Sequence, residues 1–173
     1  EKIHPNLPLF NPNYSYFLEM DPTLDIPTSK TEMGYMLWLM DLMEDEIMSI
    51  GQRLYFTSDL TYSVWAVSQL KKSLPFLVGS TPSVWTYALE KLPLLSIYVV
   101  YLVSREDALL DFLSVWRHVK PHTTGNDLKA RGLQPGPRFG EILDQLRSAW
   151  LDGVLSSKTE EDALVEKILS EER

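Results

Sequence analysis

The sequence contains no cysteine, which excludes a disulfide framework and a thiolate metal site. Histidine is scarce as well: there are three, and Pro121 separates His118 from His122, which are four residues apart. A serine nucleophile elbow, a phosphate-binding glycine loop and a histidine–glutamate metal helix are also absent. We therefore expect no metal site, no cofactor and no catalytic residue within this chain.

Long hydrophobic runs are lacking too. The longest apolar stretch, residues 92–103, is too short to cross a bilayer as a helix and is interrupted by Pro93 and Ser96. No N-terminal segment combines a charged start, an apolar stretch and a cleavage site. We expect a soluble, cytoplasmic protein with no membrane contact. The first residue is Glu1 rather than methionine, which indicates either a piece of a longer protein or processing.

Positive charge is in short supply. The 173 residues carry 16 basic and 24 acidic side chains, a formal net charge of −8, which argues against a general nucleic-acid binder. The distribution is uneven, because residues 1–70 hold three basic and ten acidic groups. From Arg117 to Arg138, in contrast, five basic groups face one acidic group, Asp127. A polyanion is therefore expected to bind this stretch and to be repelled elsewhere.

Proline divides the chain into two parts. Residues 1–30 hold five prolines among several aromatic residues, a spacing that prevents a long helix or a central strand. We interpret residues 1–30 as a proline-rich arm or linker and residues 31–173 as a single helical domain. With hydrophobic residues at 45%, the chain can bury a sizeable core. The predicted fold is all-α, an irregular bundle of about seven or eight helices.

Helical periodicity begins at Glu32, where apolar residues recur at three- and four-residue steps as far as Ile50, and Gly51 ends or bends this helix. Its methionines fit a core face better than a binding groove. Residues 92–103 would also suit a strand, but a lone strand has no partner, so we predict a helix. A second helix is predicted from Asp59 to Ser73, capped by Ser58 and closed by Pro75, and a third begins at Pro82 or Ser83, capped by Thr81. Another begins at Ser104, which forms a capping box with Asp107. The remaining helices are predicted from Asn126 to Arg131, from Pro135 or Pro137 to about Gly153, and from Thr159, which caps its helix together with Asp162.

The most informative stretch runs from Thr123 to Leu143. Its threonines can cap a short helix, and Gly132 stands where the chain must adopt a left-handed conformation to leave that helix. Free amides at helix starts, together with nearby cations, can bind phosphate; alternatively, this is only a tight corner with ordinary surface charges. The residues expected to shape the turn are Gly125, Gly132, Pro135, Gly136, Pro137 and Gly140, with Gly140 allowing another backbone to come close.

This stretch resembles the C-terminal helical region of the tRNA nucleotidyltransferase/poly(A) polymerase family, the CCA-adding type included. Weaker likeness extends upstream through Glu46, Ile50 and Arg53-Leu54, and through Pro82-Ser83 to Leu89. The motifs that carry the resemblance are Thr124-Gly125-Asn126-Asp127-Leu128, Gly132-Leu133, Pro135-Gly136-Pro137, Gly140, Ile142-Leu143 and Leu151-Asp152-Gly153.

The resemblance implies that the chain is the helical body and tail of such an enzyme. In this family an N-terminal head adds nucleotides to an RNA 3′ end with Mg and ATP or CTP; its glycine turn and aspartate pair are absent here, and Glu44-Asp45-Glu46 reads as a solvated acidic face. The expected partners are tRNA or other RNA and the enzyme's own head domain. The expected RNA-binding residues are Arg117, Lys120, His122, Lys129, Arg131 and Arg138.

The alternative function is a helical protein-interaction module with no nucleic-acid role. The acidic first half and the aromatic residues could dock a protein partner, or pair two copies into a homodimer through Trp38, Trp65 and Trp85. Tryptophan is more often a core residue, which favours burial of these three. Salt dependence separates the two functions, because binding to phosphates weakens steeply with salt.

Overall fold

The computed structural model describes residues 16, 21–27 and 29–170, and these form helices with no strand. The predicted all-α class is confirmed, and the number of α-helices is close to the number expected. Most of the predicted arm lies outside the described residues. The elements are η1 (Pro22–Leu24), α2 (Lys30–Leu39), α3 (Glu44–Arg53), α4 (Ser58–Leu77), α5 (Pro82–Leu89), α6 (Leu94–Ser104), α7 (Asp107–Ser114), η2 (Trp116–His118), α8 (Gly125–Ala130), α9 (Pro137–Leu151) and α10 (Lys158–Ser170).

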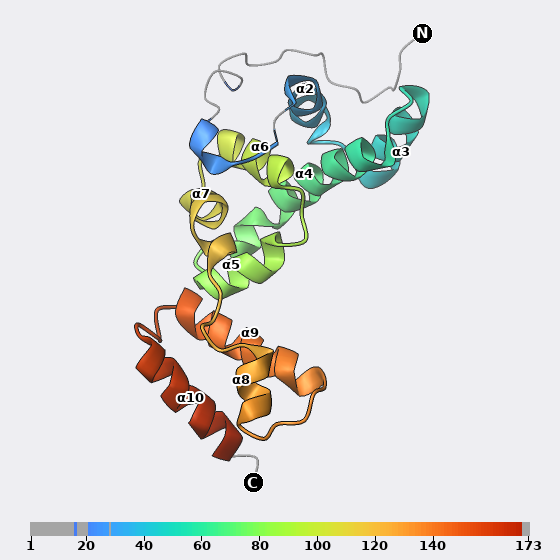
Figure 1. Ribbon diagram of the computed structural model, residues 1–173. Helices are drawn as coiled ribbons and strands as arrows, with labels where there is room; N and C mark the ends of the chain where they lie inside the picture. The colour runs from blue at the N-terminus through green and yellow to red at the C-terminus, as the bar shows by residue number, and fades with distance from the viewer. Residues whose placement is uncertain (1–15, 17–20, 28, 171–173) are drawn as a thin grey trace.

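Two hydrophobic cores follow one another along the chain, and Figure 1 shows them as an upper and a lower group of helices. We call residues 21–118 the N-terminal lobe and residues 125–170 the C-terminal lobe. The larger core belongs to the N-terminal lobe, where 22 apolar residues from η1 to α7 are buried. The core of the C-terminal lobe is small and consists of Leu128, Ile142, Leu146, Val165 and Ile168.

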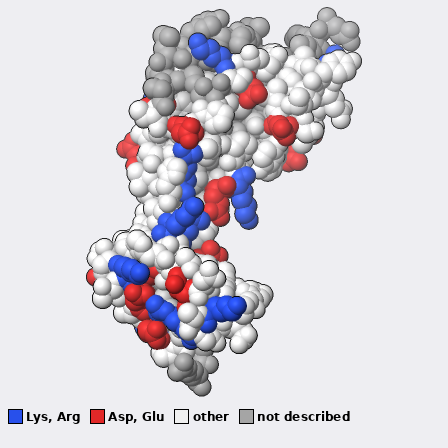
Figure 2. All heavy atoms as spheres, in the orientation of Figure 1, with Lys and Arg blue, Asp and Glu red and all other residues white. Residues whose placement is uncertain are grey.

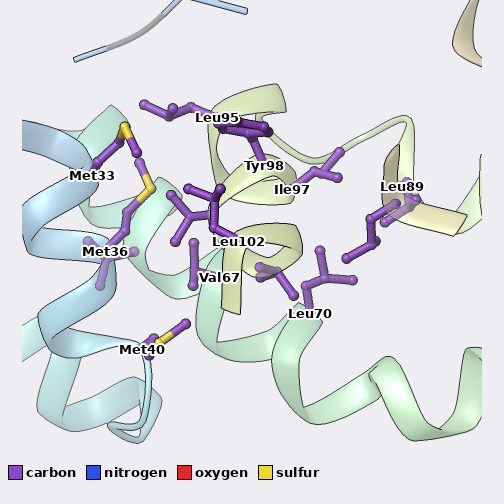
Figure 3. Close-up of a cluster of buried hydrophobic side chains, with 14 of the residues drawn as sticks. Met33, Met36, Met40, Val67, Leu70, Leu89, Leu95, Ile97, Tyr98 and Leu102 are labelled. Carbon is purple, nitrogen blue, oxygen red and sulfur yellow. The ribbon is translucent and has the colours of Figure 1, made fainter. Parts of the chain in front are cut away.

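The methionines of α2 form part of the larger core. Figure 3 shows Met33, Met36 and Met40 facing Val67 of α4 and Leu102 of α6. All three are buried, which confirms the core interpretation for these methionines, but it is wrong for Met43 of the same series, which is 58% exposed. The unbranched methionine side chain fits irregular spaces between helices. Among the tryptophans considered for pairing, the one on α5 is buried and the other two are half-buried.

Helix α6 crosses the centre of the N-terminal lobe. Every residue from Leu95 to Val100 is buried, and α6 packs against α2, α4 and α7. A helix that is apolar on all sides is stable only when other elements surround it. The helix predicted for residues 92–103 is therefore confirmed. Within the described residues, none of the helices combines the length and the apolar character that a membrane span needs.

Two helices, α2 and α3, occupy residues 32–50, so the single helix predicted there is wrong. The helix is interrupted between them, and there Glu46 Oε2 accepts a hydrogen bond from the Met43 N–H at 2.8 Å. This capping interaction supplies a partner for an amide at the start of a new helix. Leu42, which lies in the break, is buried and anchors the connection in the core.

Helix α4 differs from its prediction at both ends. Thr57, rather than Ser58, is its cap, because the Leu60 N–H donates to Thr57 Oγ1 at 3.2 Å. The helix also continues two residues beyond Pro75. A proline in the last turn removes only one hydrogen bond of the ladder, so it does not end the helix there.

The capping residues predicted for α7 and α10 are also wrong. Ser104 is the last residue of α6, and α7 begins after Glu106. At α10, the Ser157 hydroxyl accepts a hydrogen bond from the Glu160 N–H at 3.3 Å, so Thr159 lies inside the helix. At α10 a neighbouring serine takes the capping position, whereas Glu106 before α7 makes no side-chain capping hydrogen bond.

Contacts between α5 and α9 join the two lobes (Figure 1). Asp152, just after α9, accepts hydrogen bonds from the Ser83 N–H at 2.8 Å and the Ser83 hydroxyl at 2.7 Å. The Tyr87 hydroxyl donates to the Asp144 carbonyl at 3.0 Å. A carboxylate at the start of α5 satisfies a free amide and complements the helix dipole. Two motifs quoted for the family resemblance, Pro82-Ser83 and Leu151-Asp152-Gly153, therefore meet in space.

Candidate nucleic-acid interface

The start of α8 is closed by a capping box. Asp127 Oδ2 accepts hydrogen bonds from the Thr124 N–H at 2.7 Å and the Thr124 hydroxyl at 2.6 Å, and the Asp127 N–H points back to Thr124 Oγ1 at 3.4 Å. The Thr124 hydroxyl, more than the Thr124 amide, lowers the pKa of Asp127 below its ordinary value. Of the two threonines predicted as possible caps, Thr123 and Thr124, the cap of α8 is therefore Thr124. The expectation of free amides beside the cations is wrong for α8, because a carboxylate already stands there.

The end of α8 is a tight reversal at Gly132. The Leu133 N–H donates to the Leu128 carbonyl at 3.1 Å, and the Gly132 N–H donates to the Lys129 carbonyl at 3.0 Å. This pair of hydrogen bonds is the Schellman arrangement, which requires a left-handed residue after the helix. Gly132 has φ of +92°, which confirms the prediction made for this glycine.

After this reversal the chain forms an exposed bend that leads into α9. Residues 134–137 are all exposed, and Pro137 is the first residue of α9, which decides between the two predicted prolines. No side chain caps α9 and no acidic residue stands in its first turn, but Arg138 does. Amides at a helix start attract anions, but Pro137 has no N–H and the Phe139 N–H donates to the Gly136 carbonyl at 3.0 Å. What the start of α9 offers an anion is therefore mainly the positive charge of Arg138.

Three other glycines were expected to shape the turn, and their surroundings differ. A Cβ at Gly140 would meet nothing within 4 Å, so Gly140 makes no close approach to another backbone. The close approach is at Gly125, where a Cβ would lie 3.3 Å from Cδ2 of Phe139. Gly136 has φ of 175°, an extended conformation open to any residue, and its surroundings are empty. The reversal therefore depends on Gly132 rather than on Gly136.

A buried carboxylate holds the connection before α8. Glu161 of α10 is 1% exposed and accepts hydrogen bonds from the backbone amides of His122 and Thr123 and from the Trp150 indole. Burial alone raises the pKa of Glu161, but these hydrogen bonds lower it more strongly, so that the net shift is downward. The ionised carboxylate therefore ties α9, α10 and the connecting segment together.

Three of the six expected RNA-binding residues have exposed side chains: Lys120 and His122 in the segment between the lobes, and Lys129 on α8. The His122 ring packs edge-on against Trp150, with the ring centroids 5.3 Å apart. Within the part of the chain that the structure describes, neither Lys120 nor Lys129 forms an ion pair, and both side chains are exposed to solvent.

The other three expected residues contact protein groups. Arg117 Nη2 donates to the Leu24 carbonyl at 2.7 Å, which fixes η1 to the end of the N-terminal lobe. Arg131 forms ion pairs with Asp162 and Glu166 of α10. Arg138 pairs with Glu141 at 2.7 Å on the exposed surface of α9. Lys129 and Arg131 thus stand before the α8–α9 bend and Arg138 after it, the Arg131 side chain is turned to α10, and Arg117 lies in the other lobe.

Acidic side chains accompany these cations. Figure 2 shows blue and red atoms intermixed over the lower, C-terminal lobe rather than a single positive field. In the N-terminal lobe, Glu44 and Asp45 are exposed while Glu46 is engaged in capping. Among the residues that the structure describes, no group of three or more His, Cys, Asp or Glu residues is arranged to hold a metal ion.

Sequence reasoning missed two residues that organise this region. Arg147 of α9 donates to Glu90 of α5 at 2.8 Å and to the Val119 carbonyl at 3.1 Å, and its guanidinium lies over the Tyr87 ring at 5.7 Å. Glu161 was also overlooked. A signal for Glu161 existed, because it precedes buried residues of α10 by four and seven positions and so shares their face. No comparable signal marked Arg147.

Comparison with known proteins gives one informative likeness. The chain is 31% identical over 90 residues to an A-adding tRNA nucleotidyltransferase of Geobacter sulfurreducens. The match covers 50% of this chain but 9% of that relative's length, so the chain spans only a small part of the protein it resembles. No protein-family model matches the chain, and no solved structure matches it significantly. The likeness agrees with the family that the motifs suggest.

Proposed function

We propose that this chain is the RNA-binding helical region of a tRNA nucleotidyltransferase or poly(A) polymerase-type enzyme, which positions an RNA 3′ end for nucleotide addition by a head domain outside the chain. The likeness to an A-adding tRNA nucleotidyltransferase carries the proposal. The Mg ions and ATP or CTP of the reaction would bind to the head. The part of this chain is to hold RNA rather than to react with it.

The geometry of the bend between α8 and α9 also supports the proposal. It is exposed, Gly132 turns the chain into it, and Lys129 in the last turn of α8 and Arg138 in the first turn of α9 stand on either side of it along the chain. Duplex RNA offers little readable sequence in its narrow major groove, so contacts to phosphate and to helix shape suit tRNA-like substrates. Lys120 and His122 lie near the other end of α9, where His122 packs on Trp150, and would give RNA a second contact point closer to the N-terminal lobe.

Arg131 is assigned a second role in this proposal. Its guanidinium bridges two carboxylates of α10, so it stabilises the lobe that presents the bend. A glutamate at position 131 would face Asp162 and Glu166 and repel them. A loss of RNA binding in such a variant could come from unfolding or from a lost RNA contact. Lys129 gives the cleaner test, because its side chain is exposed.

A salt series with a tRNA transcript tests the proposed surface. Each neutralised phosphate contributes a slope of about −0.7 to −0.9 when the logarithm of the affinity is plotted against that of the salt concentration. The double variant Lys129→Glu/Arg138→Glu is expected to weaken binding and to flatten the slope by about 2. The control Lys30→Glu/Lys91→Glu makes the same change of charge in the N-terminal lobe and should leave both quantities unaltered. Equal losses in the two double variants would show that net charge, and not this surface, governs binding.

A further inference from the structure

An open groove of about 610 Å³ lies between α3 and the first turns of α4. Figure 1 places these helices at the end of the N-terminal lobe that is distant from the C-terminal lobe. The groove is therefore separate from the bend proposed to bind RNA. Its apolar lining consists of Met48, Tyr55, Phe56, Tyr62 and Trp65.

Large apolar side chains on the walls of this groove are exposed. Met48 and Tyr62 are each 42% exposed, and Tyr55 is 92% exposed. Tyr62 is held in place, because its ring stacks on Trp65 with the centroids 5.5 Å apart and its hydroxyl donates to the Lys91 carbonyl at 3.1 Å. Rigid aromatic residues of this kind carry much of the binding free energy at protein interfaces, since little conformational freedom is lost on binding.

The backbone at Tyr55 is unusual. Tyr55 has φ of +57° directly after α3, in the Schellman arrangement where the Phe56 N–H donates to the Gly51 carbonyl at 2.9 Å. Glycine is the favoured residue at that position because it has no Cβ. The Tyr55 ring is in solvent, so packing inside the chain gives no reason for a tyrosine there. A side chain kept in a strained, exposed position points to an external contact.

The charges around the groove limit what can occupy it. Glu44, Asp45 and Asp59 are exposed in the segment 44–65. Two exposed cations lie nearby, Arg53 and Lys91, whose carbonyl accepts from Tyr62, so the rim is acidic on balance. In Figure 2 the surface over α3 and the start of α4 shows uncharged atoms with acidic atoms beside them. RNA would meet repulsion at this rim. A second copy of the chain, joined through the same face, would oppose one acidic rim to another.

We propose that this groove binds the apolar face of a basic amphipathic helix of a partner protein. The apolar residues of that helix would pack on Tyr55, Tyr62 and Met48, and its lysine or arginine residues would lie along the acidic rim. Methionine adapts its shape to such a ligand. This role is independent of RNA binding and concerns the opposite end of the molecule.

The experiment uses the full chain and a fluorescein-labelled lysine–leucine peptide with apolar residues at helical spacing. Fluorescence anisotropy measures its affinity, and a glutamate–leucine peptide of the same pattern serves as the charge control. The lysine–leucine peptide is expected to bind and the glutamate–leucine peptide is not. Equal binding of both peptides, or no binding of either, would overturn the proposal.

Variants locate the binding surface. Tyr55→Ala is expected to weaken peptide binding about tenfold, as for a residue at the centre of an interface. Phe76→Ala is the matched control, because Phe76 is 85% exposed on α4 outside the groove, and it should leave the affinity unchanged. Glu44→Gln/Asp59→Asn should weaken binding more than Asp107→Asn/Asp111→Asn, which removes the same charge elsewhere. Similar losses at Phe76 and Tyr55 would contradict the assignment.

Tyr55→Gly separates a binding role from a structural one. Glycine relieves the left-handed strain, so Tm should rise while peptide affinity falls. A fall in Tm with unchanged affinity would mean that Tyr55 serves the fold alone, and the proposal would then be wrong.

Discussion

The two lobes are stabilised by different interactions. The N-terminal lobe buries 22 apolar residues around α6, whereas the core of the C-terminal lobe has five. The C-terminal lobe adds polar connections, above all Glu161 with its three donors and Arg131 with its two carboxylates. Apolar burial does not depend on pH and is not weakened by charge screening, whereas acid weakens carboxylate hydrogen bonds and salt weakens ion pairs. We therefore expect acid and salt to loosen the C-terminal lobe before the N-terminal lobe.

The largest expected effect is in the N-terminal core. Phe112→Ala removes a fully buried ring and should lower the free energy of unfolding by about 3–5 kcal/mol. Denaturant unfolding followed by tryptophan fluorescence measures the loss. Phe76→Ala removes an exposed ring and should change stability by less than about 0.5 kcal/mol. If both variants lost the same stability, the N-terminal core would not be the main support of this lobe.

The second effect concerns Glu161. Because hydrogen bonds lower its pKa in the fold, Glu161 contributes stability at pH values above its ordinary pKa of 4.5, and this contribution is lost as the pH falls through the lower folded pKa. Glu161→Gln should cost about 1–3 kcal/mol at neutral pH, because a neutral amide cannot satisfy all three donors. In this variant the C-terminal lobe should also lose less stability as the pH is lowered than it does in the wild-type chain.

Hydrogen exchange at a series of pH values provides the measurement for Glu161. The protection factors, which correct for the slower intrinsic exchange at acid pH, should fall in α8–α10 of the wild-type chain as the pH is lowered, while those of α6 stay high. The exposed Asp111→Asn variant is the control and should behave as the wild type does. An equal fall of the protection factors in both lobes would contradict the proposed difference in how the lobes are stabilised.

The contact between the lobes gives a smaller effect. Asp152→Ala removes the acceptor at the start of α5 and should cost about 1 kcal/mol, as for the loss of a helix cap. The change should appear as faster exchange of the α5 amides nearest Ser83, with the α6 amides unchanged. A loss confined to α10 would place the coupling of the lobes elsewhere.

The smallest effects distinguish two glycines of the bend. Gly132→Ala should cost about 1 kcal/mol because its φ of +92° suits glycine alone, and Gly136→Ala should be almost neutral in an extended, empty site. Thermal unfolding of the two variants is the comparison to make. A larger loss of stability in Gly136→Ala than in Gly132→Ala would contradict the conclusion that the turn depends on Gly132.

The helical class, the core face of α2 and the left-handed position of Gly132 could be predicted from the sequence, because periodicity and glycine placement act locally. The break before α3 could not, since it depends on Glu46 competing for an amide that a continuous helix would also satisfy. In the candidate site, the sequence identified the bend and its cations. It did not show that Arg117 and Arg131 have partners far along the chain, since these contacts exist only after folding.

Hydrogen exchange with and without bound tRNA tests the central claim most directly, because it locates RNA on the chain without altering a residue. Bound tRNA should slow exchange around residues 129–140 and leave residues 44–65 unchanged. Protection at residues 44–65, or none around the α8–α9 bend, would contradict an RNA-binding role for the C-terminal lobe.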